Sequence, residues 1–307
     1  MIIAETIEQA RNAVAQARNV RPHAHKTASQ AQGTMSQARN VGFTVGLVPT
    51  MGALHEGHLT LIRRCRTDCD CTVVSIFVNP VQFGTGEDLE SYPRSIEADL
   101  DVCRTLGVDL VFTPSARQMY PGENLTWIDV DRITDHLCGE SRPAHFRGVC
   151  TVVAKLFNII MPDIAYFGQK DAQQLAVIRR MVADLNMPID IRPCPTVREP
   201  DGLAMSSRNR YLAPGQRRQA LCLRRSLLCA EELIGAGQTD PAAITAAMQQ
   251  IVDEQSDAQI DYISIVDNEL LQLVTCIDSQ VLIALAVRIG PARLIDNIVV
   301  DPPAAKA

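Results

Sequence analysis

Residues 48–58 read VPTMGALHEGH and join a buried strand to a helix. The run 43–49 is short and apolar, and after Gly57 apolar side chains recur at helical spacing. A helix start offers unpaired N–H groups and the positive end of the helix dipole, so it favours phosphate. His55 and His58 lie on the same side of the first turn. The stretch predicts a phosphate-binding turn whose imidazoles stabilise transition-state charge; the alternative is a tight turn with two surface histidines.

Strands and helices alternate on both sides of this turn. Apolar or β-branched runs predict further strands at 71–78, 108–112, 164–167 and 189–193. A capping box at Thr6–Gln9 and helical spacing elsewhere predict helices at 6–19, 95–106, 149–160 and 171–186. Repeated β-α-β units of this kind predict an α/β fold, a Rossmann-like doubly wound parallel sheet with helices on both faces.

The pattern changes near residue 197, where the polar stretch VREPDGLAMSSRNRYL (197–212) is rich in turn residues. Beyond it we expect helices at 214–235 and 241–255 and short strands at 261–266, 281–287 and 292–299. The chain is therefore expected to form a Rossmann-like domain over residues 1–196 and a smaller α+β domain over 197–307. Residues 21–42 are polar and without period, which indicates a loop or an insertion in the first domain.

The composition of the chain excludes or disfavours several classes of protein. The 307 residues are 47% hydrophobic and 21% charged with a net charge of −6, which excludes a disordered chain and disfavours a nucleic-acid partner. No stretch reaches about 18 uninterrupted apolar residues, and the start MIIAETIEQA does not resemble a signal peptide. We therefore expect a cytoplasmic protein that has no membrane partner. The ten cysteines are expected to be free thiols, and Cys65, Cys69 and Cys71 to be buried, because their spacing fits no common zinc site.

A second short segment, MSSRN (205–209), lies in the turn-rich junction. Its hydroxyls, backbone amides and guanidinium suit the binding of a leaving pyrophosphate. Taken alone, the segment could be a simple Ser-rich turn. Together with His55-Glu56-Gly57-His58, it is typical of nucleotidyl transfer, in which ATP is cleaved between its α- and β-phosphates.

Longer motifs occur in order along the chain: PTMGALHEGH (49–58), SIFVNPVQF (75–83), SRPAHFRGV (141–149), PDIAYFGQKDAQQL (162–175), DGLAMSSRNRYL (201–212) and ARLIDN (292–297). By these motifs the sequence resembles the pantoate–β-alanine ligase family from about Gly42 to Asn297. Two features depart from the family pattern. Residues 21–41 are longer than expected, and the family's usual GEKD reads GQKD at 168–171, which removes one charge beside the nucleotide.

The resemblance implies a sheet of nucleotidyltransferase type and a ligase that forms a C–N bond in pantothenate biosynthesis, on the route to coenzyme A. The carboxylate of (R)-pantoate attacks the α-phosphate of ATP to give pantoyl adenylate and pyrophosphate, and the amine of β-alanine then displaces AMP. A carboxylate has a pKa of about 4, so it needs no general base. The resemblance also implies Mg²⁺ bound mainly through ATP phosphates, no metal bound by the protein itself, a C-terminal domain that acts as a lid, and a homodimer.

The resemblance assigns roles to single residues. His58 is the catalytic residue, with His55, Lys170 and Arg208 as further cations or donors. Gln82 and Gln174 bind pantoate, Gln82 also serves β-alanine, and Asp99 is a candidate water-mediated partner of Mg²⁺. An amide orients a carboxylate without neutralising it as an arginine would. The ATP-binding set is Met51, Gly52, Ala53, Leu54, His55, Glu56, Gly57, His58, Gly168, Gln169, Lys170, Asp171, Val197, Met205, Ser206, Ser207 and Arg208.

Other functions share parts of this pattern. A different nucleotidyltransferase of the same fold would transfer AMP to another substrate. An aminoacyl-tRNA synthetase shares both short signatures but needs an RNA-binding surface, which the acidic balance disfavours. A non-catalytic nucleotide sensor would keep the fold without needing the two histidines and MSSRN together.

Overall fold

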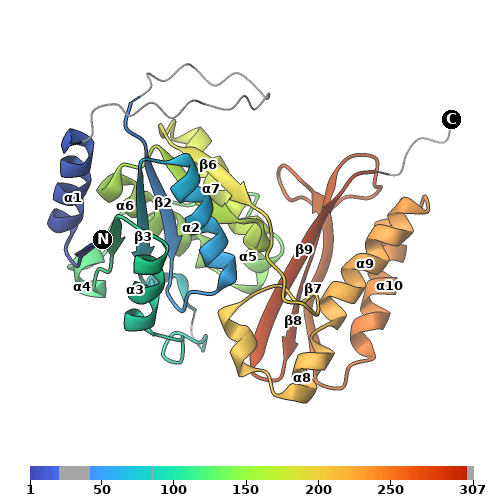
Figure 1. Ribbon diagram of the computed structural model, residues 1–307. Coiled ribbons are helices and arrows are strands. Elements are labelled where there is room, and N and C mark those ends of the chain that lie inside the picture. The colour runs from blue at the N-terminus through green and yellow to red at the C-terminus, as the bar shows by residue number, and fades with distance from the viewer. Residues whose placement is uncertain (21–41, 85, 303–307) are drawn as a thin grey trace.

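The computed structural model describes residues 1–20, 42–84 and 86–302 (Figure 1). Apart from Gly42, the loop or insertion expected at residues 21–42 lies outside the described residues. The capping box at the start of the chain is present: the amide of Gln9 donates to Thr6 Oγ1 at 3.2 Å, and the amide of Thr6 donates to Gln9 Oε1 at 3.1 Å.

The first part of the chain forms a six-stranded parallel sheet in the order β1-β4-β3-β2-β5-β6. Its strands are β1 (Ile2–Ala4), β2 (Val45–Thr50), β3 (Cys71–Ile76), β4 (Leu110–Phe112), β5 (Ile164–Gly168) and β6 (Asp190–Cys194). The predicted fold class is confirmed. Strand β1 was not predicted, because three residues are too few to show a pattern.

Helices cover both faces of this sheet (Figure 1). On one face lie α1 (Ile7–Val20), α6 (His145–Ile160) and α7 (Ala172–Asp184), and on the other α2 (Glu56–Asp68) and α3 (Ile96–Thr105). Leu47 packs in the first layer and its neighbour Val48 in the second, and both are fully buried. Because both faces are covered, the central strands are almost continuously apolar. The connection from β4 to α6 carries the short helices α4 (Ala116–Met119) and α5 (Cys138–Ser141).

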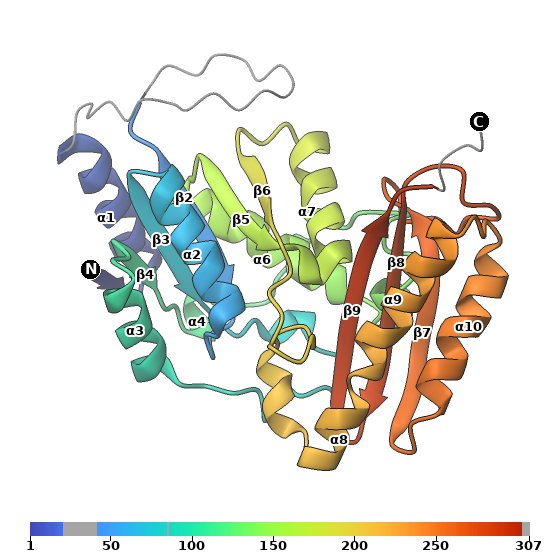
Figure 2. The same cartoon turned by 45° about the vertical axis from the view of Figure 1, so that its right-hand side comes forward.

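The second part of the chain is a three-stranded antiparallel sheet with helices on its outer face (Figure 2). The elements are α8 (Pro214–Gln219), α9 (Cys222–Gly235), α10 (Pro241–Asp253), β7 (Ala258–Asp267), β8 (Val281–Ile289) and β9 (Ala292–Val300). The single helix expected at 214–235 is wrong, since α8 ends at Gln219 and α9 begins at Cys222. Alternate residues of β8 face opposite ways: Ile283 packs under the helices, whereas Leu282 and Ala284 join the core of the parallel sheet.

None of the ten cysteines forms a disulfide, and eight of them are buried. Cys65 and Cys69 pack with Ile62, Val74 and Tyr166 beneath α2, on one face of the parallel sheet. Their expected role as small buried side chains is confirmed. In the part of the chain that the structure describes, no helix is long and apolar enough to cross a bilayer.

The carboxyl ends of β2 and β5 lie side by side at the point in the sheet where the strand order changes direction. After β2 the chain adds β3 and β4 on one side, and it then crosses to add β5 and β6 on the other. Open α/β sheets bind ligands at such a crevice. Residues 51–58 follow β2, and the 3₁₀ helix η2 (Gln169–Asp171) follows β5. Sequence segments far apart therefore meet at one end of the sheet.

Candidate active site

A cavity of about 240 Å³ opens at this crevice. Its walls come from the 51–58 turn, the end of β5, the junction before the second sheet and the apolar side of α6. The structure brings together, as lining residues, Met51, His55, Gly57, His58, Gln82, Gly168, Lys170, Asp171, Gln174, Val197, Met205, Ser206, Ser207 and Arg208. A second cavity of about 830 Å³ adjoins it, and the two share Arg142, His145, Lys170, Asp171, Gln174, Ser206 and Arg208.

Five residues expected at the nucleotide are not among those that line this cavity. Ala53 is fully buried, and Glu56 is ion-paired with Arg63 on the exposed side of α2. Gln169 turns toward the second sheet, where its backbone oxygen accepts from Asn297 at 3.1 Å. The others are Gly52 and Leu54.

Asp99 holds the backbone of the turn. The residue is 3% exposed, and its carboxylate accepts from the amides of Ala53 and Leu54, both at 2.8 Å. Gly52 and Ala53 have φ of +83° and +51°, and a Cβ at Gly52 would approach Asp99 Oδ2 to 2.9 Å. The hypothesis that Asp99 helps to hold Mg²⁺ through water stays a prediction, since each carboxylate oxygen accepts one amide here and can accept a second hydrogen bond. These two amides are committed to Asp99 rather than free for phosphate.

His55 and His58 face each other with ring centroids 4.1 Å apart. Burial, followed by the effect of Lys170, lowers the pKa of His55 to about 4. Burial, followed by the effect of His55, lowers the pKa of His58 to about 3. Both rings are therefore neutral at pH 7, and each has one N–H donor and no positive charge. The amide of His55 donates to Nδ1 of His58 at 3.4 Å, so the proton of His58 is on Nε2.

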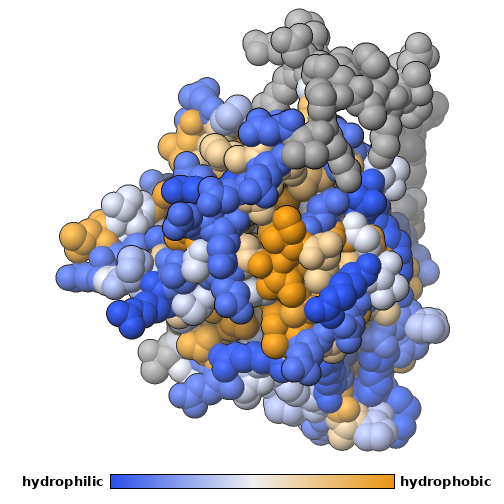
Figure 3. Space-filling model, turned by 60° about the vertical axis from the view of Figure 1, so that its left-hand side comes forward, coloured by the Kyte–Doolittle hydropathy of each residue, from blue (hydrophilic) through white to orange (hydrophobic). Residues whose placement is uncertain are grey.

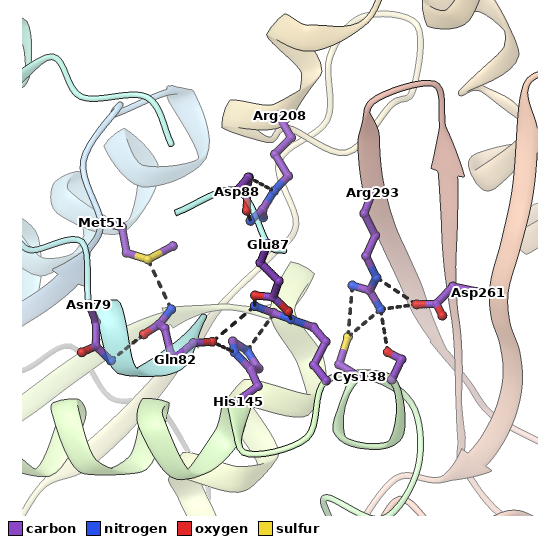
Figure 4. A network of polar contacts seen from close by, with 12 residues as sticks. Met51, Asn79, Gln82, Glu87, Asp88, Cys138, His145, Arg208, Asp261 and Arg293 are labelled. Atoms are coloured by element: carbon purple, nitrogen blue, oxygen red, sulfur yellow. Dashed lines mark hydrogen bonds and ion pairs between the residues drawn. The ribbon is translucent and has the colours of Figure 1, made fainter. Parts of the chain in front are cut away.

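Gln82 ends the 3₁₀ helix η1 (Pro80–Gln82) and is buried (Figure 4). Its Oε1 accepts from Asn79 Nδ2 at 3.0 Å, and its Nε2 donates to Met51 Sδ at 3.2 Å. Helix α6 approaches η1 so closely that a Cβ at Gly148 would lie 2.5 Å from the backbone oxygen of Val81. The amide is thus held at the wall of the cavity. Gln174 lines both cavities, whereas its neighbour Gln173 is buried and binds the backbone at Cys138 and Ile133.

Two lining residues that the sequence reasoning missed are Arg142 and His145, although their motif SRPAHFRGV was noted. Nδ1–H of His145 donates to the backbone oxygen of Gln82 at 2.8 Å, and Nε2 accepts from Arg142 at 3.0 Å. Burial, followed by the nearby Arg142, lowers the pKa of His145 to about 4. Arg142 also forms a bidentate pair with Glu87 at 2.7 and 2.6 Å. The two residues connect η1 to α6.

Two residues of the motif ARLIDN (292–297), Asp296 and Asn297, connect the second sheet to the site. Asn297 Nδ2, on β9, donates to the backbone oxygen of Lys170 at 2.7 Å. Its neighbour Asp296 is 2% exposed and forms a bidentate pair with Arg198 at 2.6 and 2.9 Å. This polar chain ties the second sheet to the segment that carries Lys170, whose Nζ lies 3.5 Å from Asp171 Oδ1.

Within residues 1–20, 42–84 and 86–302, no group of three or more His, Cys, Asp or Glu side chains is arranged to hold a metal ion.

Comparisons with known proteins agree with this geometry. A family model described as pantoate-beta-alanine ligase matches residues 23–299. The pantothenate synthetase of Heliobacterium modesticaldum is 59% identical over 260 residues, which are 85% of this chain and 92% of that protein. The pantothenate synthetase of Acetivibrio thermocellus is 54% identical over 263 residues, 86% of this chain and 94% of that protein.

Two solved structures are similar over nearly the whole chain. The crystal structure of pantothenate synthetase from Thermus thermophilus has a TM-score of 0.83 and 41% identity, and covers 97% of this chain and 99% of its own. The pantoate-beta-alanine ligase from Francisella tularensis, complexed with beta-gamma ATP and beta-alanine, has a TM-score of 0.74 and 34% identity, with 97% of each chain covered. Sequence, fold and site agree, and the chain belongs to the pantoate–β-alanine ligase family.

Proposed function

We propose that the protein condenses (R)-pantoate with β-alanine and uses ATP to do so, yielding pantothenate, AMP and pyrophosphate. It is thus an AMP-forming ligase that makes a C–N bond. One observation carries the proposal: His55 and His58, Lys170, Arg208 and the amide of Gln82 line one cavity at the crevice of the sheet. This combination serves both the transfer of a nucleotidyl group and the orientation of a small acid.

In the first step a carboxylate oxygen of pantoate forms a bond to the α-phosphorus. The bond from that phosphorus to the β-bridging oxygen breaks, and pyrophosphate leaves with the electron pair. The protein must position the groups and stabilise growing negative charge. We assign charge stabilisation to the neutral Nε2–H of His58, assisted by His55, and to the cations Lys170 and Arg208.

In the second step the free amine of β-alanine forms a bond to the acyl carbon of the adenylate. The bond from that carbon to the phosphate oxygen breaks, AMP leaves with the electron pair, and the new amide nitrogen loses a proton to solvent. Gln82 is the residue that we assign to both acids, with Gln174 as a second amide for pantoate. Val149, Val152 and Leu156 of α6 form an apolar part of the cavity lining, which suits the methyl groups of pantoate. We assign to ATP those residues of the segments 51–58, 168–171, 197 and 205–208 that line the cavity. We assign residues 197–307 to a lid domain.

Mg²⁺ is proposed to bind with ATP, mainly through phosphate oxygens, since this ion keeps much of its shell in water and phosphate. We propose the cytoplasm as the compartment, because cysteines that form no disulfide are typical of a reducing one.

A homodimer is proposed as the assembly. Figure 3 shows a strip of hydrophobic residues down the middle of the face on the β1 side of the molecule. On β1, Ile2 and Ile3 are 49% and 41% exposed. Apolar patches of this kind commonly mark a contact surface. Light scattering should give about twice the chain mass of 33.6 kDa; the mass of a single chain would contradict the dimer.

The function is tested by a product assay in which each substrate is omitted in turn. AMP and pantothenate should form in equal amounts only when ATP, pantoate and β-alanine are all present. Transfer of AMP to a different acceptor would favour another nucleotidyltransferase. Binding of ATP without turnover under any of these conditions would favour a sensor.

Replacement of Gln82 tests the acid site. Gln82→Ala removes hydrogen bonds to a charged group, each worth about 1.5–3 kcal/mol, so the KM for pantoate should rise roughly tenfold or more. Gln82→Glu should be worse, because a second carboxylate would lie beside that of the substrate. The Kd for ATP should hardly change in either variant. Steady-state kinetics and ATP titration measure these constants, and an unchanged pantoate KM in both variants would remove Gln82 from the acid site.

A further inference from the structure

The loop formed by residues 86–92 contacts the MSSRN segment from across the crevice (Figure 4). Nε and Nη2 of Arg208 donate to the two carboxylate oxygens of Asp88, both at 2.9 Å. The Arg208 guanidinium also lies over the ring of Tyr92, 5.8 Å from its centroid. The hydroxyl of Tyr211 donates to the backbone oxygen of Ser91 at 3.0 Å. The loop is thus joined to the 3₁₀ helix η3 (Ser207–Tyr211) at several points.

The same loop is anchored on its other side. Glu87 binds Arg142, which in turn contacts His145. Loop residues therefore bridge the acid side of the site, at Arg142, and the pyrophosphate side, at Arg208. An anchored carboxylate can fix the direction of a guanidinium, since the fork geometry of the pair is specific.

The pair with Asp88 leaves one edge of the Arg208 guanidinium available for another anion. A guanidinium has five N–H donors in a rigid fork. Asp88 takes one from Nε and one from Nη2, along a single edge. The edge that carries Nη1 is not used by Asp88, and Arg208 lines both cavities. The ring of Tyr92 beneath the guanidinium restricts its tilt.

Asp88 is ionised at neutral pH. Burial alone would raise the pKa of its carboxyl, but the hydrogen bonds and charge of Arg208 outweigh burial and hold the pKa below its ordinary value. A negative charge this close to a nucleotide site opposes the binding of phosphate by simple electrostatics. Asp88 is therefore expected to help the reaction through Arg208 and not through affinity for ATP.

We propose that Asp88 is a positioning residue for the adenylation step, which holds Arg208 by its Nε edge so that the Nη1 edge meets the departing pyrophosphate. This inference rests on the proposed function. It adds to the reaction a residue that lies 120 positions from Arg208 and outside every segment assigned to ATP.

The test separates the two half-reactions. Asp88→Asn should lower the rate of pantoate-dependent ATP–pyrophosphate exchange about tenfold or more, because a small misplacement of a catalytic group is costly. The KM for ATP should stay the same or fall, and aminolysis of supplied pantoyl adenylate should be unchanged. Asp88→Glu should recover part of the exchange rate. Asp129→Asn is the matched control, because Asp129 forms an exposed pair with Arg147 at 2.9 Å away from both cavities.

Coupling to Arg208 completes the test. The double variant Asp88→Asn/Arg208→Ala should exchange no more slowly than Arg208→Ala, since Asp88 acts through Arg208. An exchange rate within twofold of the wild type in Asp88→Asn, independent losses in the double variant, or equal damage to both half-reactions with a lowered Tm would overturn the inference. A wild-type protein that forms no adenylate would instead contradict the proposed function, so the two failures are distinguishable.

Discussion

Replacement of His58 by alanine should lower kcat by about 10²–10³-fold, with little change in the KM for ATP. The ring lies at the start of α2, and its Nε2–H is the free donor because Nδ1 accepts from the amide of His55. Such a donor matters most where charge develops, so its loss affects the transition state more than the ground state. Steady-state kinetics of pantothenate formation measures the change.

The control for this variant is His136→Ala. His136 lines neither cavity, and its backbone oxygen, not its ring, binds Gln173. It should keep a normal kcat. A His58→Ala enzyme with kcat within about threefold of the wild type would mean that the two histidines belong to an ordinary tight turn.

The pH profile gives a separate check on His58. Its pKa is lowered to about 3, first by burial and then by His55, so the ring is neutral above that value. The rate should therefore not fall as pH rises from 6 to 8. If the protonated imidazolium were the donor, kcat would decrease about tenfold per pH unit above the folded pKa.

Arg208→Ala should reduce ATP-dependent adenylation about 10²-fold, the effect expected for removing one preorganised donor. Pyrophosphate is present only in the first half-reaction. Aminolysis of supplied pantoyl adenylate should therefore be much less affected. Quenched single-turnover measurements of AMP and of adenylate separate the two steps.

Arg225→Ala is the matched control, because Arg225 forms an exposed pair with Glu254 and lines neither cavity. Equal loss in both half-reactions of Arg208→Ala would mean that Arg208 is structural or contacts the adenylate itself. Arg208→Ala also leaves the carboxylate of Asp88 without its arginine partner, so the Tm of this variant should be measured as well.

The sheet could be predicted because each central strand is buried on both faces, which leaves continuous apolar runs such as 71–76. The place of His55 and His58 beside the cavity could be predicted because both follow the first central strand directly. Motif resemblance brought Gln82 and Gln174 into the prediction, and both line the same cavity.

Other parts depend on contacts between distant residues, which no local pattern displays. Asp99 lies on the first turn of α3, where a carboxylate is favoured by the helix dipole alone. Its bonds to Ala53 and Leu54 arise only when two segments meet in the fold. The pairing of Asp88 with Arg208 is of the same kind. A motif indicates that residues matter, but not which partner each one binds.

The central claim is that the acid is activated as an adenylate before the amine reacts. Isotope exchange between labelled pyrophosphate and ATP tests it most directly, with Mg²⁺ and one acid at a time. The account predicts that label enters ATP when (R)-pantoate is the only other substrate, and not when β-alanine replaces it. Exchange that appears only after both pantoate and β-alanine are added would contradict a free pantoyl adenylate and, with it, the roles proposed for His58 and Arg208.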